Sequence, residues 1–298
     1  MSRIAVLGDG SWGTALTDLA RDGGHEVSIW SRKQPDTAPL ATAQAVIIAL
    51  PAQATGDVLA TLSLPPDAAL LIAAKGIERS THRFMHQVVA EACPKNPVLI
   101  LSGPSFAEDV TRALPTAVTL AAEHLEVARF WAAQLARPHF RIYASDDLMG
   151  VAIGGSLKNV LAIACGISDG KRLGASARAA LTARGFAELS RLGKALRARP
   201  ETLVGLSGLG DLLLTCSSEQ SRNYAFGKRL GEGMPIEQAL AASSGVVEGA
   251  FSAEAALALA RENGIAMPIT QAVAAIIEDG ATPESMIKSL LDRPLGTE

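Results

Sequence analysis

Residues 4–30 decide the fold, and they read IAVLGDGSWGTALTDLARDGGHEVSIW. An aliphatic, strand-like run leads directly into Gly8, Gly10 and Gly13, which have the GxGxxG spacing. A helical stretch that ends at two glycines and a second strand-like run complete the segment. In this context the glycines allow a tight turn and let a pyrophosphate approach the N–H groups at the helix N-terminus. The segment predicts a dinucleotide-binding unit; the alternative is a glycine turn without a ligand.

The same alternation of short strands and helices continues to about residue 144. Further strand-like runs lie at 46–50, 70–73, 98–101, 116–120 and 140–143, and helical stretches start near residue 80 and cover 125–136. Such alternation predicts a parallel sheet with helices on both faces. Beyond this point the sequence reads as helices separated by Gly- and Pro-containing turns. We therefore predict an α/β protein with a Rossmann-like, doubly wound dinucleotide-binding domain at 1–144 and an all-α substrate and catalytic domain at 145–298.

Composition excludes several classes of partner. The chain has 298 residues, of which 48% are hydrophobic and 19% charged, and 27 Lys and Arg against 30 Asp and Glu give a net charge of −3. Nothing in these totals favours nucleic acid or an anionic membrane surface. No basic and apolar leader follows Met1, and the apolar runs are interrupted short of a membrane span. Three scattered cysteines indicate reduced thiols and a cytoplasmic location. The five histidines have no ligand spacing beyond the pair His82 and His86, which we interpret as solvated, so no metal site is expected.

Three isolated charges stand in apolar surroundings. Lys158 is the sole charge in 148–168, Asp211 is the sole charge between Glu201 and Glu219, and Lys75 is the sole charge between Asp67 and Glu78. Burying an ammonium costs several kcal/mol unless it is compensated, and burial lowers its pKa toward neutral pH. We predict that the two cations and the anion meet in one site. The alternatives are a snorkelling lysine or a structural ion pair.

The end of the second strand carries Trp30-Ser31-Arg32-Lys33, where an NAD site would place an acidic residue. Arg32 and Lys33 favour a ribose 2′-phosphate, although an exposed basic loop tip would look the same. Only residues 34–44 then separate this strand from the next run, whereas a parallel crossover usually needs a dozen or more residues and a helix. A helix of the usual half-domain is therefore expected to be missing, which leaves the adenine side of the pocket undefined.

Other motifs lie near the expected site. Ser105 and Glu108 follow a strand with capping-box spacing, which predicts a helix N-terminus there. Arg222, between a serine and an asparagine, suits a phosphate, although a surface arginine is the alternative. Glu248 lies between apolar residues and a glycine, at a helix start or a cofactor contact. Glycines at 150, 154 and 155 predict close approach of another helix or a flat cofactor ring.

Together these residues describe a hydride-transfer site. A substrate carbonyl held over a nicotinamide needs a proton donor for the developing alkoxide and an anion clamp that fixes its pose. We expect Lys158 to supply the proton and Asp211 to orient it. Lys75 and Arg222 are expected to hold a phosphate.

Nearly the whole chain resembles the bacterial type of NAD(P)-dependent glycerol-3-phosphate dehydrogenase. The matching segments are GDGSWGTAL, IALPAQ, AAKGIE, LSGPSFAEDV, GVAIGGSLKNVLAIACGISDG, GLSGLGDLLLTCSSEQSRN and VVEG. The resemblance implies reduction of dihydroxyacetone phosphate to sn-glycerol 3-phosphate, a phospholipid precursor, by a cytoplasmic homodimer that uses NADP or NAD.

The resemblance also implies roles for individual residues. Lys158 would exchange the proton, and Lys75 would contact both cofactor and substrate. Further substrate contacts would come from Gly103, Ser105, Asp211, Ser221, Arg222 and Asn223. Further cofactor contacts would come from Ser11, Trp12, Arg32, Ala107, Arg222, Val246 and Glu248.

Two departures concern the cofactor: Asp9 stands where the family usually has a small residue, and the segment after Lys33 is short. Two other functions stay open. A β-hydroxyacid dehydrogenase has a similar architecture but clamps a carboxylate, and a non-catalytic dinucleotide sensor would need no proton donor.

Overall fold

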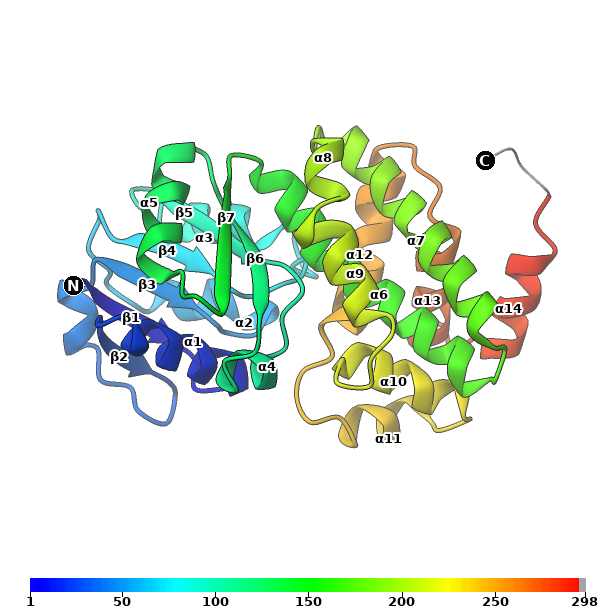
Figure 1. Ribbon diagram of the computed structural model, residues 1–298. Coiled ribbons are helices and arrows are strands. Elements are labelled where there is room, and N and C mark those ends of the chain that lie inside the picture. The colour runs from blue at the N-terminus through cyan, green and yellow to red at the C-terminus, as the bar shows by residue number, and fades with distance from the viewer. Residues whose placement is uncertain (295–298) are drawn as a thin grey trace.

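The computed structural model describes residues 1–294 and shows a sheet half followed by a helical half (Figure 1). The sheet has the strand order β2-β1-β3-β4-β5-β6-β7. The strands are β1 (Arg3–Leu7), β2 (Glu26–Trp30), β3 (Ala45–Ile48), β4 (Ala69–Ile72), β5 (Val98–Ser102), β6 (Thr116–Ala122) and β7 (Phe140–Ser145). The predicted α/β class and Rossmann-like sheet are confirmed.

Two strands, β6 and β7, depart from the predicted parallel arrangement and run opposite to β1–β5. β5 and β6 pair antiparallel, with Leu101 opposite Leu120, while every other neighbouring pair is parallel. The segment between them contains only the short helix α4 (Ala107–Thr111), which does not cross the sheet to the opposite edge. β6 therefore begins where β5 ends and runs back beside it.

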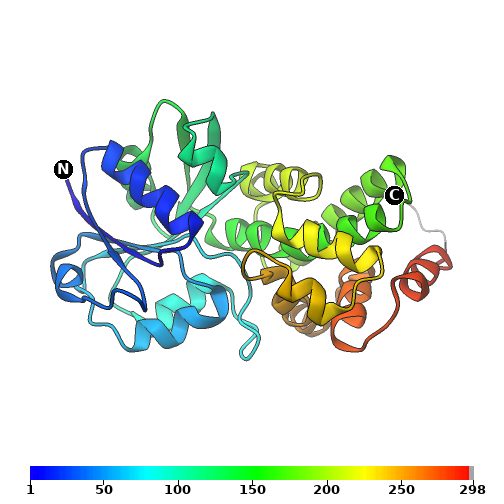
Figure 2. The ribbon, with the colours of Figure 1, turned by 90° about the horizontal axis from the view of Figure 1, so that it is seen from below.

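Helices cover both faces of the sheet. On one face α1 (Ser11–Asp22) and α5 (Leu125–Leu135) pack on alternate strand residues such as Ile4 and Val6. On the other face α2 (Ala52–Ala60) and α3 (Met85–Ala92) pack on Ala5 and Leu7 (Figure 2). Strands buried on both faces explain why these runs are apolar throughout.

The connection from β2 to β3 lacks a helix, as the short spacing predicted. Its one regular element is a 3₁₀ turn, η1 (Ala38–Thr42). Two other expectations were wrong. The helix expected near residue 80 is α3, which begins at Met85. The capping box is absent, because α4 has Phe106 as its N-cap and the Ser105 hydroxyl instead donates to the Gly103 carbonyl at 3.2 Å.

The second half is helical after β7, as predicted. Its elements are α6 (Leu148–Gly170), α7 (Ala175–Ala195), α8 (Pro200–Leu203), a π-helical turn η2 (Leu206–Gly210), α9 (Asp211–Thr215), α10 (Arg222–Gly231), α11 (Ile236–Ala241), α12 (Glu248–Glu262), α13 (Pro268–Glu278) and α14 (Pro283–Leu291).

Helix α6 is the centre of the helical half, and α7, α9, α10, α12 and α13 all contact it. It is long and apolar enough to cross a membrane, but 89% of its most apolar window is buried inside the fold. Glycines let α10 approach closely: a Cβ at Gly166 would lie 2.1 Å from the Tyr224 carbonyl oxygen, and one at Gly227 would lie 2.1 Å from that of Ile163. Helix α6 is therefore a core helix that carries Lys158 to the boundary between the halves.

Candidate active site

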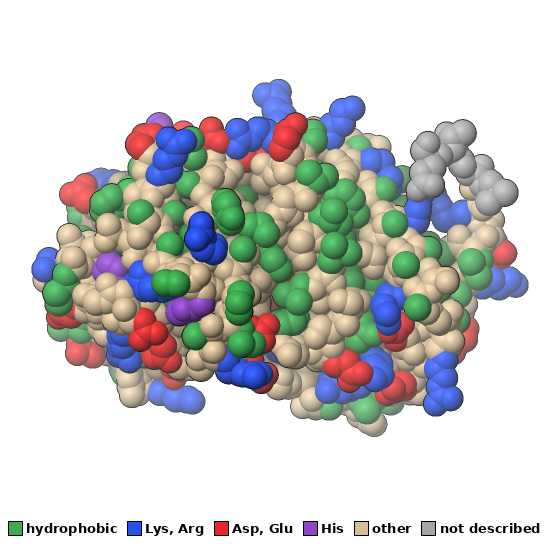
Figure 3. Space-filling view, in the orientation of Figure 1, with side chains coloured by type: hydrophobic (Ala, Val, Ile, Leu, Met, Phe, Trp, Pro, Cys, Tyr) green, Lys and Arg blue, Asp and Glu red, His purple; other side chains and the backbone are tan. Residues whose placement is uncertain are grey.

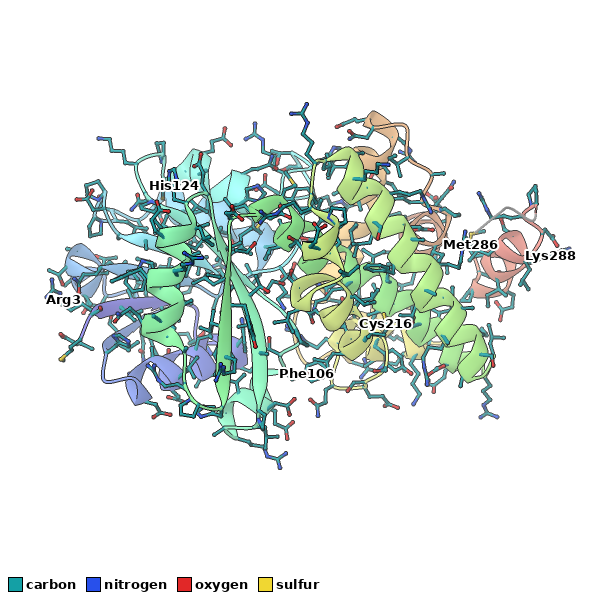
Figure 4. All side chains as sticks on the ribbon, turned by 45° about the horizontal axis from the view of Figure 1, so that its top comes forward. Arg3, Phe106, His124, Cys216, Met286 and Lys288 are labelled. Atoms are coloured by element: carbon teal, nitrogen blue, oxygen red, sulfur yellow. The ribbon has the colours of Figure 1, made fainter. Side chains whose placement is uncertain are left out.

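A cavity of about 770 Å³ lies between the carboxyl ends of the strands and the helical half. The β1–α1 turn, the loop after β4 and the α4 region line it from the sheet side, and α6, α10 and the start of α12 line it from the helical side. Phe106, at the α4 N-terminus, lines the cavity and lies at the boundary between the two halves in Figure 4. The carboxyl edge of a doubly wound sheet is the expected place for a ligand.

The three isolated charges meet, as predicted. Asp211 is fully buried and accepts from the Lys75 Nζ at 2.7 Å through Oδ2 and from the Lys158 Nζ at 2.5 Å through Oδ1. The Lys158 side chain is 8% exposed and the Lys75 side chain 13%. Both lysines also line the cavity. One carboxylate therefore holds two ammonium groups at the cavity wall.

The cluster tunes the acidity of Lys158. Burial lowers the pKa of Lys158 to about 8; the charge of Lys75 adds to this lowering, and the charge of Asp211 opposes it. Two cations share one anion, so the cluster carries an excess positive charge in a mostly dry setting. A lysine in this state can exchange a proton near neutral pH.

Thr215 is a member of the cluster that sequence reasoning missed. Its Oγ1 accepts from the Lys158 Nζ at 3.0 Å and donates to the Asp211 carbonyl oxygen at 2.6 Å. It lies four residues after Asp211, one turn along the same helix, and this spacing is the signal that could have found it. Lys158 is thus fixed by two acceptors from α9.

The strap of residues 75–77 joins the two halves of the molecule. The Ser156 hydroxyl on α6 donates to the Gly76 carbonyl at 3.0 Å, and the Ile77 N–H donates to the Ser252 Oγ on α12 at 3.4 Å. Gly76 has φ +155°, which other residues adopt only with strain. Lys75 itself donates to the Gly103 carbonyl at 3.2 Å. The position of Lys75 therefore depends on the helices that carry the rest of the site.

The glycine turn has the shape that a dinucleotide needs. Gly8 has φ +114°, and a Cβ at Gly13 would lie 2.1 Å from the Gly8 carbonyl oxygen, so the turn packs directly on the helix. Gly10 is the N-cap of α1, and a Cβ there would have no atom within 4 Å, which leaves its cavity side open. No side chain caps α1, so its first N–H groups can receive a pyrophosphate.

Glu248 bridges the halves and leaves one oxygen unpaired. Its Oε1 accepts from the Ala52 N–H at 3.1 Å, while Oε2 is buried without a partner among the described residues. Burial raises the pKa of Glu248, against the lowering effects of the Ala52 N–H and the Arg222 charge. A buried carboxylate oxygen without a partner calls for a donor.

The residues at the start of α10 line the cavity, and two of them also make structural hydrogen bonds. The Ser221 hydroxyl caps α10 by accepting from the Tyr224 N–H at 3.2 Å. Asn223 accepts from the Gly249 N–H at 2.9 Å and donates to the Asn159 Oδ1 at 3.0 Å, so it links α6, α10 and α12. Arg222 lines the cavity from the first turn of α10. Asn159, which also lines the cavity, was not singled out from the sequence.

The cavity gathers most of the predicted site. All of the expected cofactor residues line it, namely Gly8, Gly10, Ser11, Trp12, Gly13, Arg32, Lys33, Lys75, Ala107, Arg222, Val246 and Glu248. The expected substrate residues Ser105, Lys158, Ser221, Arg222 and Asn223 line it as well. Gly103 and Asp211 lie behind the surface and touch Lys75 instead.

The glycines of α6 near Lys158 face protein. A Cβ at Gly154 would lie 2.3 Å from the Ser207 carbonyl oxygen, and one at Gly155 would lie 2.6 Å from the Ser102 Oγ. The close approach predicted for this face is therefore made by η2 and β5. The flat cofactor ring, the other occupant considered, has no room there.

A dinucleotide turn and a buried lysine–carboxylate cluster that open into one cavity define an NAD(P)-dependent dehydrogenase. Family models for the NAD-dependent glycerol-3-phosphate dehydrogenase C-terminus and N-terminus match residues 147–288 and residues 3–43 and 33–128. The chain belongs to the NAD-dependent glycerol-3-phosphate dehydrogenase family.

Named relatives agree with this assignment. The chain is 46% identical to a glycerol-3-phosphate dehydrogenase [NAD(P)+] of Parvibaculum lavamentivorans over 326 positions, which cover 99% of this chain and 98% of that one. It is 46% identical to the Brucella ovis enzyme of the same name, with 100% and 99% covered. The crystal structure of a Coxiella burnetii glycerol-3-phosphate dehydrogenase is 36% identical, with a TM-score of 0.92 over 98% of this chain and 99% of that one.

The comparisons also locate where this chain is short. The N-terminal family model matches in two pieces that overlap at residues 33–43. The alignment with the Parvibaculum lavamentivorans relative has 326 positions and this chain has 298 residues, so at least 28 positions have no counterpart here. The match to the N-terminal model breaks within 33–43, a stretch that belongs to the β2–β3 connection.

Proposed function

We propose that this protein reduces dihydroxyacetone phosphate to sn-glycerol 3-phosphate with NAD(P)H and so supplies glycerophospholipid synthesis. The observation that carries the proposal is the Lys158–Asp211–Lys75 cluster in the same cavity as the β1–α1 glycine turn. Residues 1–144 would serve as the dinucleotide-binding domain and residues 145–298 as the substrate and catalytic domain, with the cavity between them.

Lys158 is the proton donor in this proposal. A bound nicotinamide dinucleotide supplies the hydride, and the carbonyl oxygen of the substrate then needs a proton as it becomes an alkoxide. A lysine whose pKa is lowered to about 8 gives up a proton more readily than an ordinary lysine and is still mostly charged at neutral pH. Asp211 and Thr215 hold the Lys158 ammonium in place during the transfer.

The substrate phosphate is held by cations on opposite sides of the cavity. Lys75 comes from the sheet side and Arg222 from the first turn of α10. A guanidinium binds a phosphate through two parallel hydrogen bonds, and the positive end of the α10 helix dipole adds to the attraction. A β-hydroxyacid substrate would present a carboxylate and no phosphate, so the two substrate classes can be separated by assay.

Glu248 and the glycine turn position the dinucleotide. The unpaired Oε2 of Glu248 would accept from the nicotinamide carboxamide, and the first N–H groups of α1 would hold the pyrophosphate. Because Glu248 also accepts from the Ala52 N–H, the ring would be held where the two halves meet.

We further propose a cytoplasmic homodimer. Tyr143, Val204 and Leu213 are 56%, 58% and 54% exposed, and the middle of the face in Figure 3 shows apolar side chains with few charges. A contiguous exposed apolar surface is typical of an interface. All three cysteines are free thiols, which fits a reducing compartment. Sedimentation of wild type and Leu213→Glu tests the dimer, which the variant should weaken.

A steady-state assay tests the reaction. Oxidation of NADH or NADPH should depend on dihydroxyacetone phosphate and should be at least about a hundredfold less efficient with 3-oxo acids of similar size, which lack the phosphate. Equal efficiency with the acids would reject the proposed substrate. Cofactor binding without turnover of any of these compounds would favour a sensor.

A further inference from the structure

The end of the cofactor site that would hold the adenosine has fewer walls in this protein than in a complete doubly wound half-domain. The chain passes from β2 to β3 through residues 31–44 with only the turn η1. Among the residues that the structure describes, none between 34 and 48 lines the cavity. Residues 32–39 are all exposed. A helical crossover would ordinarily pack beside this end of the sheet.

The remaining wall at this end is apolar. Its side chains come from the β3–α2 corner and from α2, and they are Leu50, Pro51, Ala54 and Val58. Such a wall can contact a flat ring, but its side chains offer no donor or acceptor to the edge of a base. Reading a purine requires hydrogen bonds to its edge, and these side chains provide none.

The polar groups gather where β2 ends. Trp30 and Ser31 are 7% and 4% exposed, and the Trp30 Nε1 and Ser31 Oγ have no hydrogen-bond partner among the described residues. Both residues line the cavity together with Arg32 and Lys33. An indole N–H, a hydroxyl and two cations form a set rich in donors, which suits a phosphate on the ribose. No carboxylate from this segment is present to accept from a free 2′-hydroxyl.

We propose that this chain holds its dinucleotide through the ribose phosphate and the pyrophosphate and does not read the purine, so that it accepts nicotinamide dinucleotides with an altered base. The proposal rests on the proposed function, because it concerns the cofactor of that reaction. The shortened β2–β3 connection is its cause, since the missing segment would have bounded the base from the side opposite α2.

Binding of NADP+ analogues tests the proposal without turnover. Isothermal titration would compare NADP+ with its hypoxanthine and etheno-adenine analogues, which both change the hydrogen-bonding edge of the base. In this protein each analogue should bind within about threefold of NADP+, because no contact to that edge is lost. NAD+ should bind at least about tenfold more weakly than NADP+, because it lacks the 2′-phosphate.

The Parvibaculum lavamentivorans relative is the matched comparison, because its alignment contains the positions that this chain lacks. It should bind the two analogues at least about tenfold more weakly than NADP+. A tenfold loss for the analogues in this chain would overturn the proposal, and so would equal tolerance in the relative, since the short connection would then not be the cause. If this chain bound neither NADP+ nor NAD+, the proposed function itself would fall.

Discussion

The charge of Lys75 should control the acidity of Lys158, and Lys75→Met tests this directly. Each ammonium contacts a different oxygen of Asp211, at 2.7 Å for Lys75 and 2.5 Å for Lys158. Two unit charges repel by roughly 3 kcal/mol at about 5 Å when the effective dielectric constant is about 20, which corresponds to roughly two pKa units. Without the Lys75 ammonium, both carboxylate oxygens of Asp211 are available to the Lys158 ammonium.

The expected result is a pKa of Lys158 that rises from about 8 toward its ordinary value. Ketone reduction needs the protonated lysine, so its rate should be constant below the pKa of Lys158 and fall above it. In Lys75→Met the residual kcat/KM for reduction should therefore stay level to a pH roughly two units higher than in the wild type. The activity of Lys75→Met will be low because Lys75 also faces the substrate. The pH at which kcat/KM begins to fall can still be measured, because it does not depend on the size of kcat/KM.

Lys33→Met is the matched control, because Lys33 lines the same cavity at its other end. It should change the KM for the dinucleotide and leave the break in the pH profile near that of the wild type. If the break in Lys75→Met stayed at the wild-type position or moved to lower pH, then Lys75 would not be what holds down the pKa of Lys158, and the shared-carboxylate account would be wrong.

Four further changes have defined expectations. Lys158→Met should retain dinucleotide binding by titration and lose about a thousandfold or more in kcat; near-normal turnover would remove Lys158 from the mechanism. Ser156→Ala removes the hydrogen bond to the Gly76 carbonyl and should lower kcat to about a fifth. It should also shift the pKa of Lys158 in the pH profile, whereas a purely structural role of Ser156 would leave that pKa unchanged. Asp9→Ala removes an anion from the cavity and should tighten dinucleotide binding about threefold at low salt, with no gain at about 1 M salt. Glu188→Ala leaves two N–H groups and a hydroxyl at the start of α13 without their acceptor and should lower the free energy of unfolding by about 3 kcal/mol in urea; an unchanged midpoint would contradict this.

The fold of the first half could be predicted because its signals are local. A glycine turn between an apolar run and a helix has few other uses, and strands buried on both faces must be apolar. The missing β2–β3 helix was also visible, because the eleven residues that follow Lys33, 34–44, leave little room for one. The capping box failed because α4 begins one residue later than the S-x-x-E signal places it, with Phe106 at the N-cap and the Ser105 hydroxyl bonded to the Gly103 carbonyl.

The site was predictable as a set of residues and not as an arrangement. A charge that stands alone in an apolar run must find compensation, so Lys75, Lys158 and Asp211 could be chosen from the sequence by themselves. Their pairing could not be chosen, because Asp211 lies 53 residues from Lys158 and 136 from Lys75 along the chain. Only the packing of α6 against α9, and of the strap at 75–77 against both halves, decides which oxygen each lysine meets.

The sequence by itself thus determined the dinucleotide turn, the helical second half and the charges that the interior must satisfy. The tertiary structure alone decided that β6 and β7 run opposite to the other strands, that Thr215 completes the cluster and that Glu248 spans from α12 to Ala52. The physical reason is the range of the interactions. Turns and apolar periodicity act over a few residues, whereas buried polar groups pair with whatever partners the packing of distant segments brings within hydrogen-bond distance.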